Sequence, residues 1–222
     1  MVVGLEETLL FKSMFMIDVN ASTRVVVAKC PIGHFSTGSL LLTDADCTPL
    51  SEDWVVHMVQ GAAESWDVHV GLSLPSPPHP DAQSTWLQRI QRLEARRVAQ
   101  RTVGAIDVGK PYMAFGRNLA FTREMWERVG GFDDHLHVPS GDDDLWLQQA
   151  FAAGAKVHVS THKESQTTSI WPDSWRAWRR QKTRHFSAST MYPWPVRITL
   201  IVPGLGWLLL LAGVVHNPSL TS

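Results

Sequence analysis

An α/β domain with a mainly parallel sheet flanked by helices, followed by one transmembrane helix, is the fold class that the sequence predicts. Short continuous apolar runs, rather than alternating apolar and polar residues, are typical of strands buried on both faces. Amphipathic segments with helical spacing separate these runs, which is the order of elements in α/β proteins. The chain of 222 residues has the usual size of a single domain.

The predicted strands are short runs rich in aliphatic and β-branched residues. We expect them at 15–19, 23–28, 39–43, 68–74, 113–121 and 156–160. The run at 39–43 leads directly into an acidic loop that contains Asp44 and Asp46. The run at 68–74 precedes a Pro-rich stretch, which predicts a stiff loop there.

Helices are predicted between and after these strands, at 51–61, 85–101, 123–129, 142–153 and 171–189. Ser51 is a candidate N-cap for the first of them. In the second, apolar residues such as Trp86 and Ile90 recur near helical spacing, with charged or amide residues between them. Gly130 and Gly131 predict the end of the third helix.

The charges are distributed unevenly along the chain, although the net charge is only -1. Residues 1–170 carry 14 basic and 20 acidic residues, residues 171–197 carry six basic residues and one acidic residue, and residues 198–222 carry none of either kind. This pattern excludes a nucleic-acid-binding protein that relies on bulk positive charge, and it argues against a purely soluble enzyme.

The apolar segment Val196–Val215 predicts a transmembrane helix, which we place at 194–216 with its flanks. About 20 apolar residues are needed to cross the hydrocarbon core of a bilayer. Tyr192 and Trp194 lie where interfacial aromatic residues are expected, and the basic segment before them predicts that the main domain faces the cytoplasm at the inner (plasma) membrane. The alternative is a buried C-terminal core helix.

The two cysteines, Cys30 and Cys47, are too few for a disulfide framework, and no Cys/His spacing indicates a zinc site. We therefore expect reduced thiols, as in cytosolic domains. No secretory signal is predicted, because no basic segment with an apolar run and a cleavage site stands at the N-terminus.

Asp44 and Asp46 form the first candidate site. They follow a buried strand, at the sheet edge where α/β proteins bind ligands. Carboxylate oxygens suit Mg²⁺ or Mn²⁺, which neutralise the charge of a departing diphosphate. The alternative is a solvated acidic turn.

The second candidate site is the run SGDDDL at 140–145. N-capping and the helix dipole account for one or two carboxylates at a helix start. Three in succession repel one another and raise the pKa of at least one, which suits a general base or a group near a cation.

The third candidate site lies in the basic, Trp-rich segment. Gln181, Arg184 and His185 are three or four residues apart, on one helical face, where they could hold an acceptor or a diphosphate. The plainer interpretation is an amphipathic helix on anionic lipid, and both can hold together.

Five motifs follow one another along the chain: TDADC at 43–47, GRNLAF at 116–121, VGGFDD at 129–134, SGDDDLWL at 140–147 and QKTRH at 181–185. Together they resemble family 2 glycosyltransferases of the GT-A fold, in particular the bacterial membrane-anchored branch with a QxxRW-type motif. The resemblance covers about residues 39–215. It implies a Rossmann-like fold, a nucleotide-sugar donor, and a glycan or lipid-linked acceptor at the membrane.

The resemblance also implies roles for individual residues. Asp44 and Asp46 match the DxD motif that holds Mg²⁺ or Mn²⁺ on the donor diphosphate. The SGDDD segment supplies the catalytic base of an inverting displacement; alignment on the following leucine favours Asp142, and alignment on Gly-Asp-Asp favours Asp143. Gln181, Arg184 and His185 match QxxRW with His in place of Trp. Asn118 of GRNLAF is counted among the donor- or acceptor-binding residues.

The N-terminal part differs from the family pattern. Only 43 residues precede Asp44, so we expect a GT-A-like domain at 1–190 whose nucleotide-binding part is truncated. Residues 15–23 resemble the second strand of the family, with Asp18 in the acidic position near the donor base.

Two other functions are compatible with parts of the sequence. LLLTDADCT also matches the nucleophile motif of haloacid dehalogenase-type phosphatases, with Thr48 closing the motif. An inactive membrane-anchored fragment or pseudoenzyme of the glycosyltransferase family is the second alternative.

Overall fold

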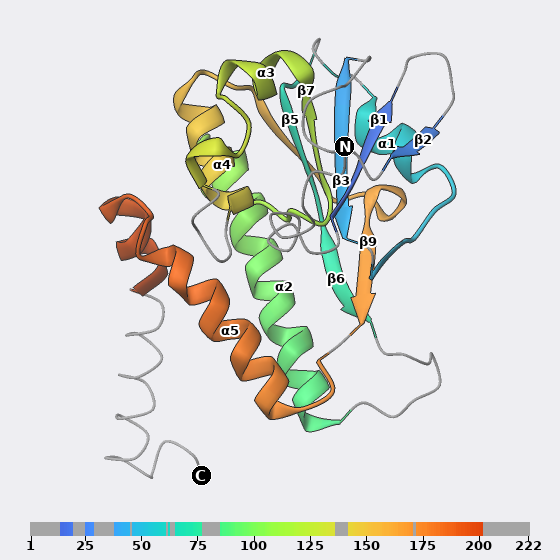
Figure 1. Ribbon diagram of the computed structural model, residues 1–222. Coiled ribbons are helices and arrows are strands. Elements are labelled where there is room, and N and C mark those ends of the chain that lie inside the picture. Colours follow the sequence, from blue (N-terminus) through green and yellow to red (C-terminus); the bar gives the residue numbers. More distant parts are fainter. Residues whose placement is uncertain are drawn as a thin grey trace, which may run out of the picture.

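The computed structural model describes residues 38–44, 46–60, 62, 65–76, 85–135, 142–170 and 172–201, together with the backbone of 14–19 and 25–28. Two sheets and the helices around them form the fold (Figure 1). The apolar core lies on both sides of the larger sheet, and the smaller sheet begins where the acidic loop after residue 44 ends.

The larger sheet has six strands in the order β2-β1-β3-β7-β5-β8. Their bounds are β1 Met14–Val19, β2 Val25–Ala28, β3 Ser39–Asp44, β5 Val68–Gly71, β7 Leu119–Thr122 and β8 Val157–Ser160. Only β5 and β8 pair in parallel among the described neighbours of this sheet; the other pairs are antiparallel. The prediction of a mainly parallel sheet is therefore wrong.

The physical reason is that β7 lies between β3 and β5. Those two strands run in the same direction, but each forms its hydrogen bonds with the reversed β7. The apolar run in β3 correctly predicted burial on both faces, since Leu40, Leu41 and Leu42 have no exposed surface. Burial on both faces is common in parallel sheets but does not require them.

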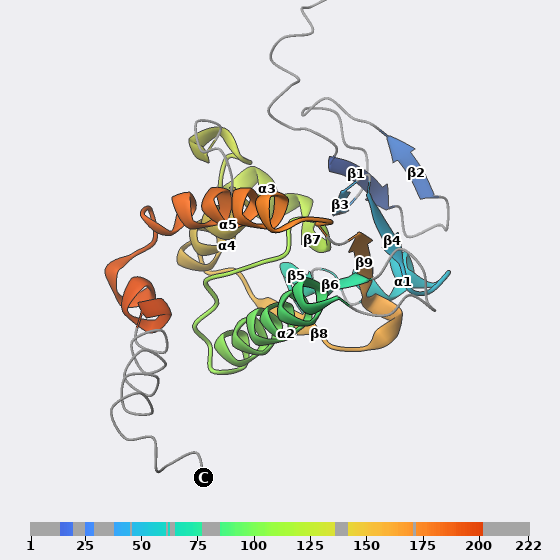
Figure 2. The same ribbon diagram turned by 90° about the horizontal axis from the view of Figure 1, so that it is seen from below.

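The alternation of side chains along β3 divides the core into two parts. Leu40 and Leu42 join the larger cluster, on the face covered by α2, α3 and α4, while Leu41 packs with Trp54 and Met58 on the opposite face, under α1. The helices are α1 Trp54–Val59, α2 Trp86–Asp107, α3 Arg123–Arg128, α4 Asp142–Ala152 and α5 Trp175–Ser189. Figure 2 shows these layers seen from below.

The smaller sheet has the order β4-β9-β6, with β4 Cys47–Pro49, β6 Ser73–Ser76 and β9 Thr167–Ile170. The sequence did not predict it as a separate sheet. The expected single strand at 68–74 divides at Leu72 into β5 and β6, which belong to different sheets. Because β4 follows the acidic loop, the two sheets meet at the carboxyl end of β3.

A capping motif in the sequence explains where α2 begins. The Thr85 hydroxyl accepts from the Gln88 N–H at 3.2 Å, and the Gln88 side chain accepts from the Thr85 N–H at 2.9 Å. This reciprocal capping box fixes the first turn of the helix. The first helix, in contrast, starts at Trp54, and Ser51 accepts from the Asp53 N–H just before it.

The C-terminal prediction falls mostly outside the described residues. Residues 194–201 are helical, and the predicted transmembrane segment continues to residue 216, beyond that part. Tyr192 is buried against Leu145 rather than placed at an interface, whereas Trp194 is exposed. No helix among the described residues combines the length and apolarity that crossing a bilayer requires.

Candidate active site

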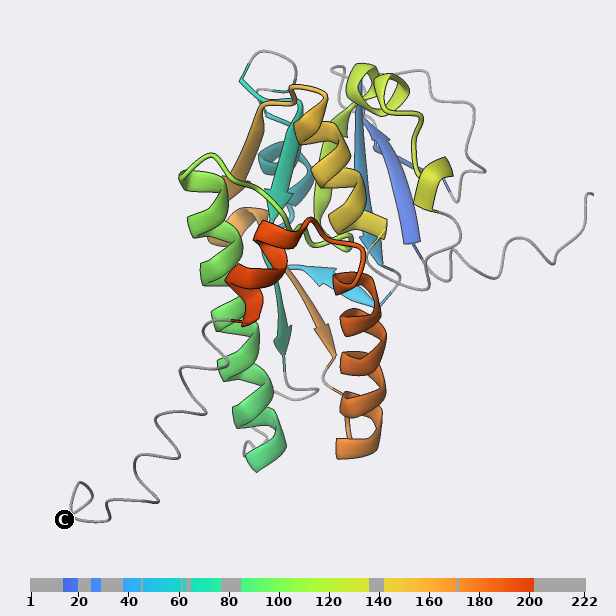
Figure 3. The same ribbon diagram turned by 90° about the vertical axis from the view of Figure 1, so that its left-hand side faces the viewer.

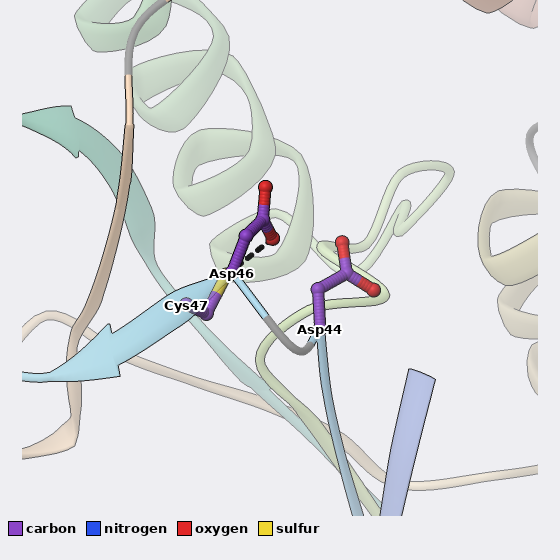
Figure 4. A group of neighbouring side chains, drawn as sticks. All are labelled: Asp44, Asp46 and Cys47. Carbon is purple, nitrogen blue, oxygen red and sulfur yellow. Dashed lines mark hydrogen bonds between the residues drawn. The ribbon is translucent and has the colours of Figure 1, made fainter. Parts of the chain in front are cut away.

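Three side chains that can bind a metal ion lie close together at the end of β3, namely those of Asp44, Asp46 and Cys47. Asp44 and Cys47 are half-buried and Asp46 is exposed. One ligand atom of each lies within 4.8 Å of the others. In Figure 4 the carboxylates of Asp44 and Asp46 point to the same side of the loop, and the Cys47 thiol faces Asp46 at 3.9 Å.

The surroundings of this group shift two pKa values. Burial raises the pKa of Asp44, as do the charges of Asp46 and Asp142, while the charges of Arg117 and Arg184 oppose them. Burial also raises the pKa of the Cys47 thiol to about 11, and the two neighbouring carboxylates act in the same direction. Asp44 therefore lies within the electrostatic reach of α4, of α5 and of the loop before β7.

Arg117 is a central residue that the sequence analysis did not single out. The β3–β7 ladder ends with Leu42 opposite Leu119, and Arg117 lies in the turn just before β7, close enough for its charge to lower the pKa of Asp44. Its guanidinium donates to the Ser169 hydroxyl on β9 at 3.0 Å. Ser169 in turn pairs with Cys47. The signal was present, because Arg117 lies inside the GRNLAF motif.

The three carboxylates at the start of α4 do not share one role. Asp143 accepts from the Gly116 N–H at 2.6 Å, and Asp144 accepts from the Ala114 N–H at 2.8 Å and from the hydroxyl of Tyr192. A Cβ at Gly116 would lie 2.9 Å from the Asp143 carboxylate, so this close contact requires glycine. Asp143 and Asp144 thus fix the loop before β7 onto α4.

Burial raises the pKa of both anchoring carboxylates, to about 7 for Asp143, and each is raised further by a neighbouring aspartate. The charge of Asp142 raises the pKa of Asp44, so Asp142, the first residue of α4, lies within electrostatic reach of the acidic loop. Asp143 and Asp144 instead accept hydrogen bonds from the backbone of residues 114–116.

Helix α5 brings part of the third motif to the same place. Arg184 lies close enough to Asp44 for its charge to lower the carboxyl pKa. His185 is exposed on α5, and the surrounding atoms together with the charges of Lys182, Arg117 and Arg184 lower its pKa. Its imidazole is therefore neutral at pH 7. Gln181, half-buried, is one turn earlier on the helix.

Asn118 does not face this site. Its side chain has no exposed surface, and its amide donates to the carbonyls of Leu72 and Ser165, both at 2.8 Å. Its carbonyl accepts from the Trp54 indole at 3.1 Å. The structure thus places Asn118 as a buried link between the junction of β5 and β6, α1 and the 3₁₀ turn Lys163–Ser165, in place of the expected ligand-binding role.

Asp18 is not brought close to Asp44 and Asp46 either. Strand β1 runs antiparallel to β3, with Met14 opposite Asp44 and Asp18 opposite Leu40. Four residues of strand separate these positions, which is about 13 Å along the sheet. The side chain of Asp18 lies outside the described part of the chain.

Comparison with protein families distinguishes the glycosyltransferase interpretation of the sequence from the phosphatase interpretation. A model described as glycosyl transferase family group 2 matches residues 40–220, which include every element from β3 onward. The chain belongs to this family. A comparison with curated proteins gave no match.

Family membership accounts for the clustered motifs. The residues read alternatively as a phosphatase motif, 40–48, lie inside the matched glycosyltransferase region, so the phosphatase interpretation is replaced. The carboxylates of Asp44 and Asp46 also fit a divalent cation such as Mg²⁺ or Mn²⁺, because hard cations take oxygen ligands and the two side chains lie close together.

Proposed function

We propose that this glycosyltransferase moves a sugar from a nucleotide-sugar donor to an acceptor hydroxyl, with inversion, at the cytoplasmic face of the inner (plasma) membrane. The observation that carries the proposal is a convergence: Asp142 on α4 and Arg184 on α5, far apart in sequence, both lie close enough to Asp44 on β3 for their charges to act on its carboxyl group. Clustered acidic and basic groups of this kind are typical of functional sites.

Asp44 and Asp46 would hold Mg²⁺ or Mn²⁺ through their carboxylate oxygens. A bound divalent cation would neutralise the negative charge that develops on the departing diphosphate. Arg117 and Arg184 add two positive charges beside the same loop and can bind phosphate oxygens through several N–H groups. Together these groups favour a leaving nucleoside diphosphate.

Asp142 is the catalytic base in this proposal. The acceptor oxygen forms a bond to the anomeric carbon as the bond from that carbon to the diphosphate oxygen breaks, and Asp142 takes the acceptor proton. Asp143, the other candidate, already accepts the Gly116 N–H and holds the loop. The electrostatic reach of Asp142 to Asp44 favours Asp142 over Asp143 as the base.

His185 and Gln181 would contact the acceptor from α5. A neutral imidazole can donate through one nitrogen and accept through the other, which suits a sugar hydroxyl. The basic, Trp-rich sequence of α5 and the apolar segment after it support a membrane location, where a lipid-linked or growing glycan acceptor is available.

The test is a transfer assay with the full chain in native-like lipid, Mn²⁺ and a panel of labelled nucleotide sugars. The proposal expects release of the nucleoside diphosphate from at least one donor, and loss of that release in Asp142→Asn with donor binding retained. Binding of a donor without any turnover across the panel would favour the pseudoenzyme alternative.

A further inference from the structure

An open groove of about 820 Å³ lies between α2 and α5, away from the carboxylates of the proposed active site. Figure 3 shows the two helices side by side in front of the smaller sheet. Lys182 on α5 pairs with Glu94 on α2, and the Gln91 amide on α2 donates to the carbonyl of Pro172, three residues before α5, at 3.1 Å. The groove is therefore a defined feature of the fold.

The groove exposes large apolar side chains from both walls. Leu93 on α2 is 51% exposed, and Trp175 and Phe186 on α5 are 53% and 67% exposed. Trp178 packs edge-on against Trp175. A gathering of exposed aromatic and aliphatic residues in one hollow marks an interaction site rather than ordinary surface.

The rim of the groove is positively charged. Its lining includes four basic residues and one acidic residue, namely Arg97, Arg176, Arg179, Lys182 and Glu94. An occupant that matches both features has an apolar part and a negatively charged part. Two copies of this chain meeting through this face would bring like charges together, which opposes self-association.

The groove and the proposed active site use adjacent faces of α5. Trp175, Trp178 and Lys182 line the groove at steps of three or four residues. At 100° per residue, Arg184 lies nearly opposite that line, whereas His185, three residues after Lys182 and seven after Trp178, lies next to it. A ligand seated in the groove would therefore lie beside the helix face that carries His185.

We propose that the α2–α5 groove docks the domain onto an anionic lipid bilayer, with a lipid chain in the apolar groove and its phosphate on the basic rim. This inference rests on the proposed function at a membrane face and specifies the surface that makes the contact. Aromatic side chains at the headgroup level and basic residues beside them are the chemistry that such surfaces use.

The experiment measures partition of the full chain onto vesicles of equal parts phosphatidylglycerol and phosphatidylcholine. The test variant is Arg176→Gln/Arg179→Gln, and the matched control is Lys156→Gln/Lys163→Gln, which removes the same charge from exposed sites outside the groove. Each basic residue near an anionic surface contributes about 1 kcal/mol, so the test variant should bind about 30-fold more weakly. The control should bind like the parent chain.

A second variant, Trp175→Ala/Phe186→Ala, tests the apolar part and should also weaken vesicle binding. Every variant keeps the C-terminal apolar segment, so its contribution is common to all. Equal loss in the groove variants and the control would overturn the proposal, and so would a dimer, seen by light scattering, that the groove variants dissociate.

Titration of the same variants with UDP and GDP in Mn²⁺ separates this inference from the proposed function. Retained nucleotide binding with lost vesicle binding supports both. Vesicle binding through the groove by a chain that binds neither nucleotide would leave the docking surface standing and remove the donor site.

Discussion

Two acidic segments at one end of the sheet, residues 44–46 and residues 142–144, have the same residue type and different uses. Asp46 is exposed and Asp44 half-buried, and both carboxylates point to one side of their loop. Asp143 and Asp144 instead accept backbone N–H groups from the loop before β7. Hydrogen-bond partners and burial, rather than the density of carboxylates, therefore distinguish the two exposed or half-buried carboxylates of the first segment from the two anchoring carboxylates of the second.

The first way to sharpen this comparison is to remove a carboxylate from the exposed segment. Asp46→Ala should abolish sugar transfer, because it removes a ligand of the divalent cation. It should leave the unfolding free energy unchanged, because the Asp46 side chain is exposed. The control is Asp53→Ala, another exposed aspartate whose side chain makes no capping hydrogen bond. Full turnover in Asp46→Ala would contradict the metal role.

The second prediction distinguishes neighbours on α4. Asp142→Asn should lower kcat by about 10²–10⁴-fold, which is the usual contribution of a general base, with donor affinity retained. Asp143→Asn keeps an oxygen that can accept the Gly116 N–H, so its effect on kcat should be much smaller. The reverse order of the two effects, measured under saturating donor and acceptor, would assign the base to Asp143.

The third prediction concerns stability rather than activity. Asp144→Ala removes the acceptor for the Ala114 N–H and the Tyr192 hydroxyl, leaving buried donors without a partner. A loss of about 1–3 kcal/mol in unfolding free energy is expected in urea titrations. Tyr192→Phe removes one of these hydrogen bonds and should cost less. An Asp144→Ala chain as stable as the parent would contradict the anchoring role.

The fourth prediction uses the raised pKa of Asp143. Because its pKa is about 7 in the folded chain and near 4 when unfolded, the folded state retains a proton that the unfolded state loses. Its contribution to stability is fully present below pH 4 and is lost as the pH rises toward 7. The melting temperature of Asp143→Asn should therefore fall less between pH 4 and pH 7 than that of the parent chain. Parallel pH profiles of the melting temperature for parent and variant would contradict the raised pKa of Asp143.

Several features could be predicted from local sequence. The apolar run at 39–43 predicted a strand buried on both faces just before Asp44, and the amphipathic pattern predicted a helix from residue 85, where a capping box begins α2. The direction of the strand pairs could not be predicted, because it depends on where β7 inserts, and that placement is set by tertiary contacts. The strands of the smaller sheet have mixed polar sequences with Pro and Ser, which carry little periodicity.

The site was predictable in its motifs and not in its contacts. Asp44, Asp46 and the α4 aspartates follow recognisable local patterns. Arg117 enters the site from the turn before β7, and Tyr192 reaches Asp144 across 48 residues. Asn118 belongs to a matching motif, yet its polar atoms are all used inside the protein. Long-range pairing of this kind has no signal in a single sequence.

The central claim is that the segment 44–47 is the cation and donor-diphosphate site. Calorimetric titration of the full chain with UDP and GDP, with and without Mn²⁺, tests it most directly, with Asp46→Ala alongside. The account predicts that one nucleotide binds only when Mn²⁺ is present and that Asp46→Ala abolishes this binding. Binding that is independent of Mn²⁺, or no binding of either nucleotide at millimolar concentration, would contradict it.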